Sequence, residues 1–302
     1  MNDPESIVNK RKELSSEGQE LASYLEGQVR DRKIEVPMLP DVASRVLAAS
    51  YDPDSDAALL AKLIQGDQAL AGHVMRIANS AAYTPNASMV SLQQAIARLG
   101  MELITEIALA ASLNAKLFKA PSFEARMSEI WDHALCSGIW GKEVARFSKK
   151  NVEASFLCGL LHSIGRPAIL QDIAEYTHQH GIHISYEEAM TLEQMFHVSY
   201  GEVIVQKWNM PIIVQESVQH YLNYIDAKNC RDQAMVVDGA TKLAQVTLLK
   251  DDAFEEADAK NNFLEGVFAD IVFADLNLYE DEIELLKEQE DKVKSALEAM
   301  RL

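Results

Sequence analysis

Apolar side chains recur every three or four positions along nearly the whole chain, with charged and polar residues between them. This spacing places the apolar side chains on one face of an α-helix. It predicts helices within residues 6–30, 42–51, 59–66, 69–77 and 91–100 in the first third of the sequence. No stretch alternates apolar and polar residues as a half-buried strand does, so the pattern predicts an all-α protein.

Several residues mark where the predicted helices begin and end. Ser91 can accept a hydrogen bond from a free amide at a helix start, and Gly100 and Gly181 are typical of helix ends. Two further pairs, Ser185 with Glu188 and Ser199 with Glu202, have the spacing of a capping box. Each pair therefore predicts the first turn of a helix.

The composition limits the possible function classes. The 302 residues include 28 basic and 46 acidic side chains, a net charge of -18. Nucleic acids and anionic membrane surfaces are bound mainly through Lys and Arg, so neither partner is expected. The sequence shows no secretory leader and no apolar run of membrane-spanning length, and its three cysteines are scattered. These features predict a cytoplasmic protein with reduced thiols.

The negative charge is concentrated at one end of the chain. Residues 251–302 contain 16 acidic and 5 basic residues, which accounts for -11 of the -18. The sequence therefore predicts an acidic helical extension after the main domain, serving as a contact surface or as an aid to solubility.

Two histidines stand in distinctive sequence settings, His133 in WDHA and His162 in LLHSIGR. They belong to an ordered set of blocks that resembles the HDOD family, the HD-related output domain of bacterial signalling proteins. The blocks are Leu39-Pro40, Ile64–Asp67, Val74–Ala81, Ser91–Ile96 with Leu99-Gly100, Trp131–His133, Gly159–Gly165, Trp208–Pro211 and Val237-Asp238. Each block is short, but their order along the chain is specific.

The resemblance implies a multi-helix bundle similar to the HD domain. It implies three parts: an N-terminal helix over residues 1–33, an HDOD-like domain over 34–244, and the acidic helical extension over 245–302.

HD domains include metal-dependent phosphohydrolases, whose site uses a His, a His-Asp pair and a later Asp. Matched position by position, the resemblance implies a vestigial metal site at His133, His162 and Asp238. Imidazole and carboxylate ligands together suit a divalent ion, which can acidify water and orient a phosphate.

Four positions near this predicted site change its chemistry. Ser163 stands where the Asp of the pair is expected, and a hydroxyl cannot supply the missing negative charge. Tyr200 and His220 lie in two later blocks that only partly match the family pattern, and Arg166 stands where the enzymes have Lys. Ser163, Arg166, Tyr200 and His220 are predicted pocket residues that could contact a phosphate.

A rival histidine cluster lies in HQHGIH, where His178, His180 and His183 are close in sequence. No acidic or Cys partner has the spacing of a known metal site, and histidines near a helix end are common without metal.

Nucleophilic catalysis has no support, because the sequence lacks a Gly-x-Ser-x-Gly elbow.

Two functions from different classes follow from these features. The first is a regulatory signalling protein that acts by protein–protein interaction, with a degenerate HD metal site and no catalysis. The alternative is a metal-dependent phosphohydrolase acting on a nucleotide or phosphodiester. No cofactor is expected for the first function, and weak binding of Mn, Fe, Ni or Mg is left open. The identity of the signalling partner and self-association into a homo-oligomer are left open too.

Overall fold

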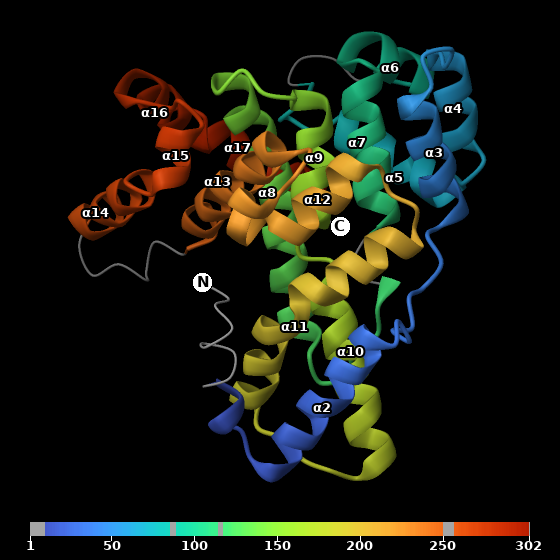
Figure 1. Cartoon of the computed structure of the whole chain (residues 1–302). Coiled ribbons are helices and arrows are strands. Elements are labelled where there is room, and N and C mark those ends of the chain that lie inside the picture. Colours follow the sequence, from blue (N-terminus) through green and yellow to red (C-terminus); the bar gives the residue numbers. More distant parts are fainter. Residues whose placement is uncertain (1–9, 85–88, 114–116, 250–256, 302) are drawn as a thin grey trace. The chain divides into compact units, whose positions relative to one another are not determined.

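The chain is helical throughout the part that the computed structural model describes, which is residues 10–84, 89–113, 117–249 and 257–301 (Figure 1). Its elements are α2 (Ser16–Arg30), α3 (Asp41–Tyr51), α4 (Ala57–Gln65), α5 (Gln68–Ala78), α6 (Leu92–Leu99), α7 (Met101–Ser112), α8 (Glu124–Phe147), α9 (Val152–Leu161), α10 (Gly165–His180), α11 (Tyr186–Lys207), α12 (Ile212–His220), the 3₁₀-helix η2 (Tyr221–Asp226), α13 (Arg231–Leu248), α14 (Ala257–Phe268), α15 (Ile271–Asp275), α16 (Glu280–Lys287) and α17 (Glu290–Met300). The predicted all-α class is confirmed. None of the described helices is both long and apolar enough to cross a bilayer.

The chain folds into two compact units. The first comprises Met1–Pro37 and Phe118–Ile283, and the second comprises Met38–Leu117 and Glu284–Leu302. This division by compactness differs from the three parts that the sequence resemblance implies. The boundaries at residues 33/34 and 244/245 therefore stay a prediction.

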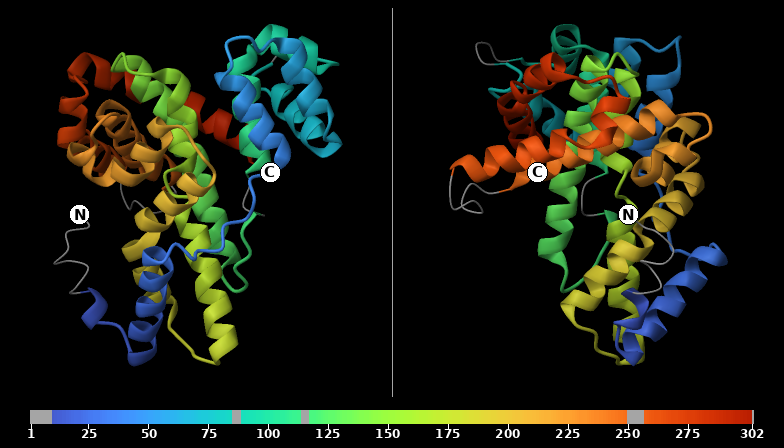
Figure 2. Two further views of the ribbon diagram at one scale, coloured as in Figure 1. Left: turned by 45° about the vertical axis from the view of Figure 1, so that its right-hand side comes forward. Right: turned by 60° about the vertical axis from the view of Figure 1, so that its left-hand side comes forward.

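The second unit gathers α3 to α7, the blue-to-teal helices of Figure 2. The predicted helices within residues 42–51, 59–66, 69–77 and 91–100 correspond to α3, α4, α5 and α6. Ser91 caps α6 as expected, since its hydroxyl accepts a hydrogen bond from the Gln94 amide at 3.1 Å. Helix α17, from the end of the chain, packs against α7 in the same unit.

The helical stretch predicted within residues 6–30 is interrupted in the described part of that range. Helix α2 begins only at Ser16, and the chain leaves helical geometry just before it. Ser15 causes the break, because its hydroxyl accepts a hydrogen bond from the Gly18 amide at 3.0 Å and so starts a new helix. Residues 6–9 lie outside the described residues.

The two predicted capping boxes have different outcomes. Ser185 and Glu188 form one at the start of α11, with both reciprocal hydrogen bonds present. Ser199 lies inside the same helix, so the second prediction is wrong. Buried side chains continue on both sides of it, at Met195 and Ile204, and the tertiary contacts keep the helix unbroken through the Ser-x-x-Glu pattern.

The acidic extension contributes to the core of the first unit. Phe273 and Leu276, in and just after α15, are buried. A methyl group placed on Gly239 of α13 would lie 3.5 Å from Phe273 and 3.6 Å from Leu276, so these side chains pack directly on that helix. The described part of the extension is helical as predicted, and the segment around α15 covers part of α13.

Candidate functional site

His133 and His162 meet because α8 and α9 approach each other closely. A methyl group on Gly159 of α9 would lie 2.6 Å from the Ser137 carbonyl oxygen and 2.7 Å from Gly138 Cα, both on α8. Only glycine allows this backbone contact. It brings the residue that ends α9, His162, next to His133, and their ring centroids are 5.3 Å apart in an edge-to-face arrangement.

A pocket of about 620 Å³ lies beside the two histidines, entirely within the first unit. All three predicted metal ligands line it, as do the predicted contacts Ser163 and Arg166. The other lining residues are Arg126, Glu129, Ile130, Gln194, Tyr221, Leu222, Thr241, Lys242, Gln245, Leu248 and Leu249. The structure thus brings His133, His162 and Asp238 to one cavity, while their role as metal ligands stays a prediction.

Both pocket histidines are held in the neutral form. Burial, helped by the positive charge of Arg166, lowers the pKa of His133 to about 4. Burial also places the pKa of His162 well below its usual value, and the neighbouring His133 and Arg166 add to this effect. His162 Nδ1–H donates to the Gly159 carbonyl at 2.6 Å, which leaves its other ring nitrogen as an acceptor.

The third predicted ligand, Asp238, is already engaged by a cation of the protein itself. Lys242 Nζ lies 2.7 Å from Asp238 Oδ2, one helical turn away on α13. The same ammonium lies 2.9 Å from Asp270 Oδ2. Burial raises the pKa of Asp238, and the hydrogen bond and charge of Lys242 act against that rise.

This donor set does not fit a divalent cation. Ser163 offers a neutral hydroxyl, and the Asp238 carboxylate faces an ammonium that would repel a metal ion. Within the described ranges, no group of three or more His, Cys, Asp or Glu side chains is arranged to hold one.

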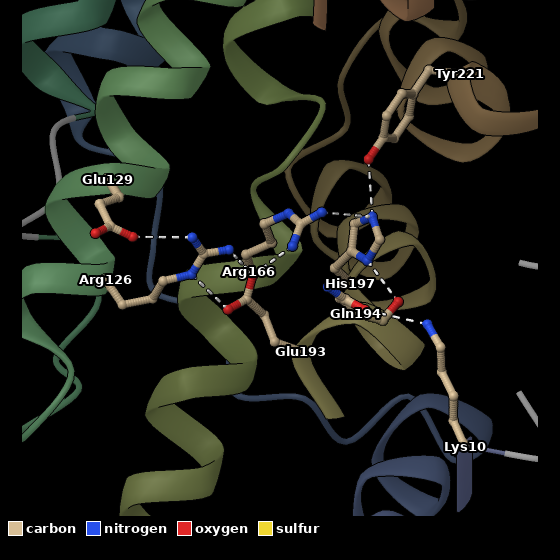
Figure 3. A network of polar contacts seen from close by, with 8 residues as sticks. All are labelled: Lys10, Arg126, Glu129, Arg166, Glu193, Gln194, His197 and Tyr221. Carbon is tan, nitrogen blue, oxygen red and sulfur yellow. Dashed lines mark hydrogen bonds and ion pairs between the residues drawn. The ribbon is translucent and has the colours of Figure 1, made fainter. Parts of the chain in front are cut away.

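A buried carboxylate holds two of the arginines that line the pocket (Figure 3). Glu193 on α11 is completely buried and lies between two arginines. Arg126 of α8 donates to both of its oxygens, at 2.8 and 3.0 Å, and Arg166 of α10 lies 2.5 Å from Oε1. Burial alone would raise the pKa of Glu193, but the two arginines outweigh it and the pKa is lowered. This triad joins three helices.

His197 extends the network by one helical turn along α11 (Figure 3). Its Nδ1–H donates to the Gln194 carbonyl at 3.0 Å, and its Nε2 accepts from the Tyr221 hydroxyl at 2.9 Å. Burial, together with the nearby Arg166 charge, lowers the pKa of His197 to about 3. The neutral ring therefore fixes Tyr221, whose side chain lines the pocket.

The remaining two predicted pocket residues are not among the side chains that line this cavity. His220 is half-buried at the end of α12, next to the lining residue Tyr221. Tyr200 is fully buried, and its hydroxyl donates to Asp172 Oδ2 at 2.8 Å. Tyr200 thus takes part in a polar contact between α10 and α11.

Replacing Asp172 by asparagine should change how stability depends on pH. Burial raises the pKa of Asp172 to about 6, from 3.8, despite the Tyr200 hydrogen bond. As pH falls, the native state therefore binds a proton at Asp172 at a higher pH than the unfolded state does. In the opposite direction, this group makes the fold less stable as pH rises from about 4 to about 6. The effect reaches about 3 kcal/mol, at about 1.4 kcal/mol per pKa unit. Urea unfolding of both proteins across this range measures it.

The expected signature is a gain in stability of Asp172→Asn over the parent that is largest near pH 7 and shrinks toward pH 4. Glu187→Gln, an exposed carboxylate on α11, serves as the control with a small change. Parallel stability curves for Asp172→Asn and the parent would contradict the assignment.

The rival histidines do not gather around one point. His178 and His183 line a separate cavity of about 590 Å³ beside α10. His180 instead stacks on Tyr176, with ring centroids 3.9 Å apart, and bonds to the Tyr176 carbonyl at 3.0 Å.

Sequence reasoning missed Glu193, His197, Tyr221 and Lys242. Two signals were available, because Glu193 and His197 are four residues apart, as are Asp238 and Lys242. Residues at this spacing share one helix face. Nothing in the sequence indicated which of these faces would border the pocket.

The HDOD domain profile matches residues 36–224, which is more than half of the chain. The chain belongs to the HDOD family. The same HDOD assignment followed from the ordered blocks in the sequence, so that prediction is confirmed.

Comparison with other proteins places this HDOD chain among distant relatives. An uncharacterized protein of Treponema pallidum (strain Nichols) is 22% identical over 226 residues, or 72% of this chain. The match spans only 42% of that relative's length.

Solved structures share the fold at low sequence identity. An HDOD domain protein of unknown function from Geobacter sulfurreducens has a TM-score of 0.70 at 19% identity, covering 93% of this chain and 96% of the other. A Shewanella amazonensis protein provisionally described as a metal-dependent phosphohydrolase has a TM-score of 0.68 at 20% identity, covering 95% and 100%. A Marinobacter aquaeolei protein provisionally described as a signal transduction protein has a TM-score of 0.60 at 16% identity, covering 97% and 68%.

Proposed function

We propose that this HDOD chain is a signalling module that works without hydrolysis, through contacts with protein partners. The observation that carries the proposal is the ion pair of Asp238 with Lys242, at 2.7 Å, inside the pocket where the family resemblance implies a metal. The side-chain ammonium stands in for an exogenous cation at this carboxylate.

The chemistry of the remaining donors supports this interpretation. A hydrolytic HD centre needs an anionic ligand directly after its second histidine, and Ser163 has no charge to offer. Changing even the partners of metal ligands typically weakens metal sites by about 10- to 100-fold. A centre that lacks one carboxylate and has the other paired with Lys242 should bind metal more weakly still.

A signalling role is supported by the family itself and by one structural neighbour. The chain belongs to the HDOD family, whose name marks it as an HD-related output domain of signalling proteins. The Marinobacter aquaeolei neighbour carries a provisional description as a signal transduction protein.

The second candidate is the metal-dependent phosphohydrolase. It is favoured by the convergence of His133, His162 and Arg166 on one pocket, and by the provisional description of the Shewanella amazonensis neighbour.

Metal content and phosphodiester hydrolysis distinguish the two functions. The purified full chain is incubated with Mn²⁺, Fe²⁺ or Ni²⁺, freed of excess ion, and assayed with bis-p-nitrophenyl phosphate. We expect substoichiometric metal and the same background rate as for His162→Gln. Stoichiometric metal with turnover that His162→Gln abolishes would overturn the proposal.

A gain-of-function variant tests the same explanation through a positive result, an increase in metal affinity. Ser163→Asp combined with Lys242→Met restores the missing carboxylate and removes the competing ammonium. We expect this double variant to bind Mn²⁺ at least about tenfold more tightly than the parent, because a ligating anion is regained. Equal metal affinity in the two proteins would show that the Asp238–Lys242 ion pair does not block the site.

The partner half of the proposal needs a direct binding measurement. A protein that co-purifies with the chain is purified separately, and its affinity for the full chain is measured by calorimetry. We expect saturable binding by the metal-free chain. Binding that requires added divalent metal would contradict a role without metal.

A further inference from the structure

The cavity of about 590 Å³ beside α10, here named the α10 groove, lies within the first unit and shares no lining residue with the histidine pocket. Its apolar wall is formed by Ile173 of α10, by Ile182 and Ile184 of the connection to α11, and by Phe123 before α8. The proposed function makes no use of this wall so far.

The apolar surface of the α10 groove continues outward to solvent. Phe123 stacks on Tyr186 at the start of α11, with ring centroids 6.4 Å apart, and Tyr186 is 55% exposed. Aromatic side chains are enriched where proteins contact one another, and exposed apolar surface at a cavity commonly marks such a contact. The groove is therefore accessible to a segment of another protein.

One wall of the groove offers backbone groups as well as side chains. Residues 182–185, between α10 and α11, belong to no helix or turn. Ile182 and Ile184 are half-buried, while His183 between them is exposed. In the part of the chain that the structure describes, the backbone amides and carbonyls of His183 and Ile184 form no hydrogen bond. Such an open edge can pair with an added extended peptide.

The charge around the groove is negative. Three exposed carboxylates border it, because Glu175 lines the groove while Glu124 and Glu187 directly follow its two stacked aromatic residues. Among the described residues, no Lys or Arg forms an ion pair with any of the three. The segments that form the groove, residues 118–124 and 173–187, contain one Lys and no Arg. A complementary partner therefore carries positive charge.

We propose that the α10 groove docks a short extended segment of a partner protein, with an apolar centre and Lys or Arg on both sides of it. The apolar side chains contact the isoleucine and phenylalanine wall, the peptide backbone pairs with His183 and Ile184, and the basic side chains face the three carboxylates. This inference rests on the proposed function, because it names the surface and the kind of segment through which the signalling module binds a protein.

Fluorescence anisotropy with a labelled probe peptide tests the proposal, using the full chain in the presence of EDTA. The probe is Lys-Lys-Val-Thr-Val-Thr-Val-Lys-Lys with blocked ends. We expect it to bind saturably with a dissociation constant below about 1 mM. The same peptide with Glu in place of Lys should bind at least about tenfold more weakly, and so should the Lys peptide with its inner amides N-methylated, which cannot donate to the open edge.

Two variants and their matched controls assign the binding to the groove. Glu175→Gln removes one bordering charge, and Ile184→Thr removes apolar wall but keeps a β-branched residue at a half-buried position. Each should weaken binding of the Lys peptide by about threefold or more. Glu153→Gln and Ile212→Thr change an exposed carboxylate and an exposed isoleucine that do not line the groove. These controls should change the affinity by less than about twofold.

Four results would overturn the proposal. They are no saturable binding of the Lys peptide, equal affinity for the Glu peptide, equal affinity for the N-methylated peptide, and equal losses in the variants and their controls. The last result would mean that the peptide responds only to the net charge of -18. Failure of the proposed function gives a different result, because metal-dependent turnover would overturn that function while peptide binding in EDTA persisted.

Discussion

Replacing Glu193 by alanine should lower the free energy of unfolding by about 3 kcal/mol or more, because it leaves two arginines without their shared buried partner. The Glu193 side chain is completely buried, whereas those of Arg126 and Arg166 are 26% and 21% exposed. Desolvating three charges is tolerable only while the carboxylate compensates both guanidinium groups. Urea unfolding monitored by circular dichroism measures the loss.

Glu129→Ala provides the matched control, since it removes another carboxylate that pairs with the same Arg126. The Glu129 side chain is 65% exposed, and exposed ion pairs contribute at most about 1 kcal/mol. Comparing the two variants shows whether the loss of stability comes from the burial of the Glu193 carboxylate or only from removing a negative charge beside Arg126. A Glu193→Ala loss no larger than that of Glu129→Ala would show that the triad does not hold α8, α10 and α11 together.

Replacing Gly165 by alanine should destabilise the fold by about 3 kcal/mol or more, because overpacking a rigid contact forces the backbone to move. An added methyl group would lie 2.0 Å from the His197 carbonyl oxygen and 2.6 Å from the Gly201 amide nitrogen. Both atoms belong to the backbone of α11, so no side-chain rotation can relieve the contact. The start of α10, which carries Arg166, would have to move away.

Gly27→Ala is the control for this second prediction. A methyl group at Gly27, within α2, meets nothing within 4 Å. Alanine should stabilise that helix by about 0.5–1 kcal/mol, since glycine loses more backbone entropy on folding. Unfolding free energies that change equally in the two variants would contradict the importance of the α10–α11 crossing.

Two of the wrong helix boundaries have the same physical origin. The pattern of apolar residues reports which face of a segment is buried, and it says little about where the helix starts. Ser15 begins a new helix inside the predicted stretch through one side-chain hydrogen bond, while Ser199, with an equally suitable pattern, did not begin one. Tertiary packing of the flanking side chains made the difference.

The candidate site was predictable where it depended on the family pattern. His133, His162, Ser163, Arg166 and Asp238 were all named from the sequence, and all line one pocket.

The ion-pair partners of the charged side chains were not predictable from sequence spacing alone. Asp238 and Lys242 are four residues apart on one helix, but Asp270 reaches the same ammonium from the turn before α15. Tyr200 and His220, which the sequence assigned to the pocket, are absent from its described lining. Adjacent residues point in different directions on a helix, so Tyr221 lines the cavity while His220 does not.

The sequence by itself determined that this protein is helical, that it has the ordered blocks of the HDOD family, and that a negative charge is missing after His162. These are properties of local periodicity and residue identity. Only the tertiary structure decided how the remaining charges pair. Glu193 compensates two arginines from other helices, and the close approach of α10 to α11 at Gly165 brings one of them, Arg166, to it. Lys242 compensates Asp238 on its own helix and Asp270 from the turn before α15. Burial then makes these pairings decisive, since a charge removed from water must find its partner inside the protein.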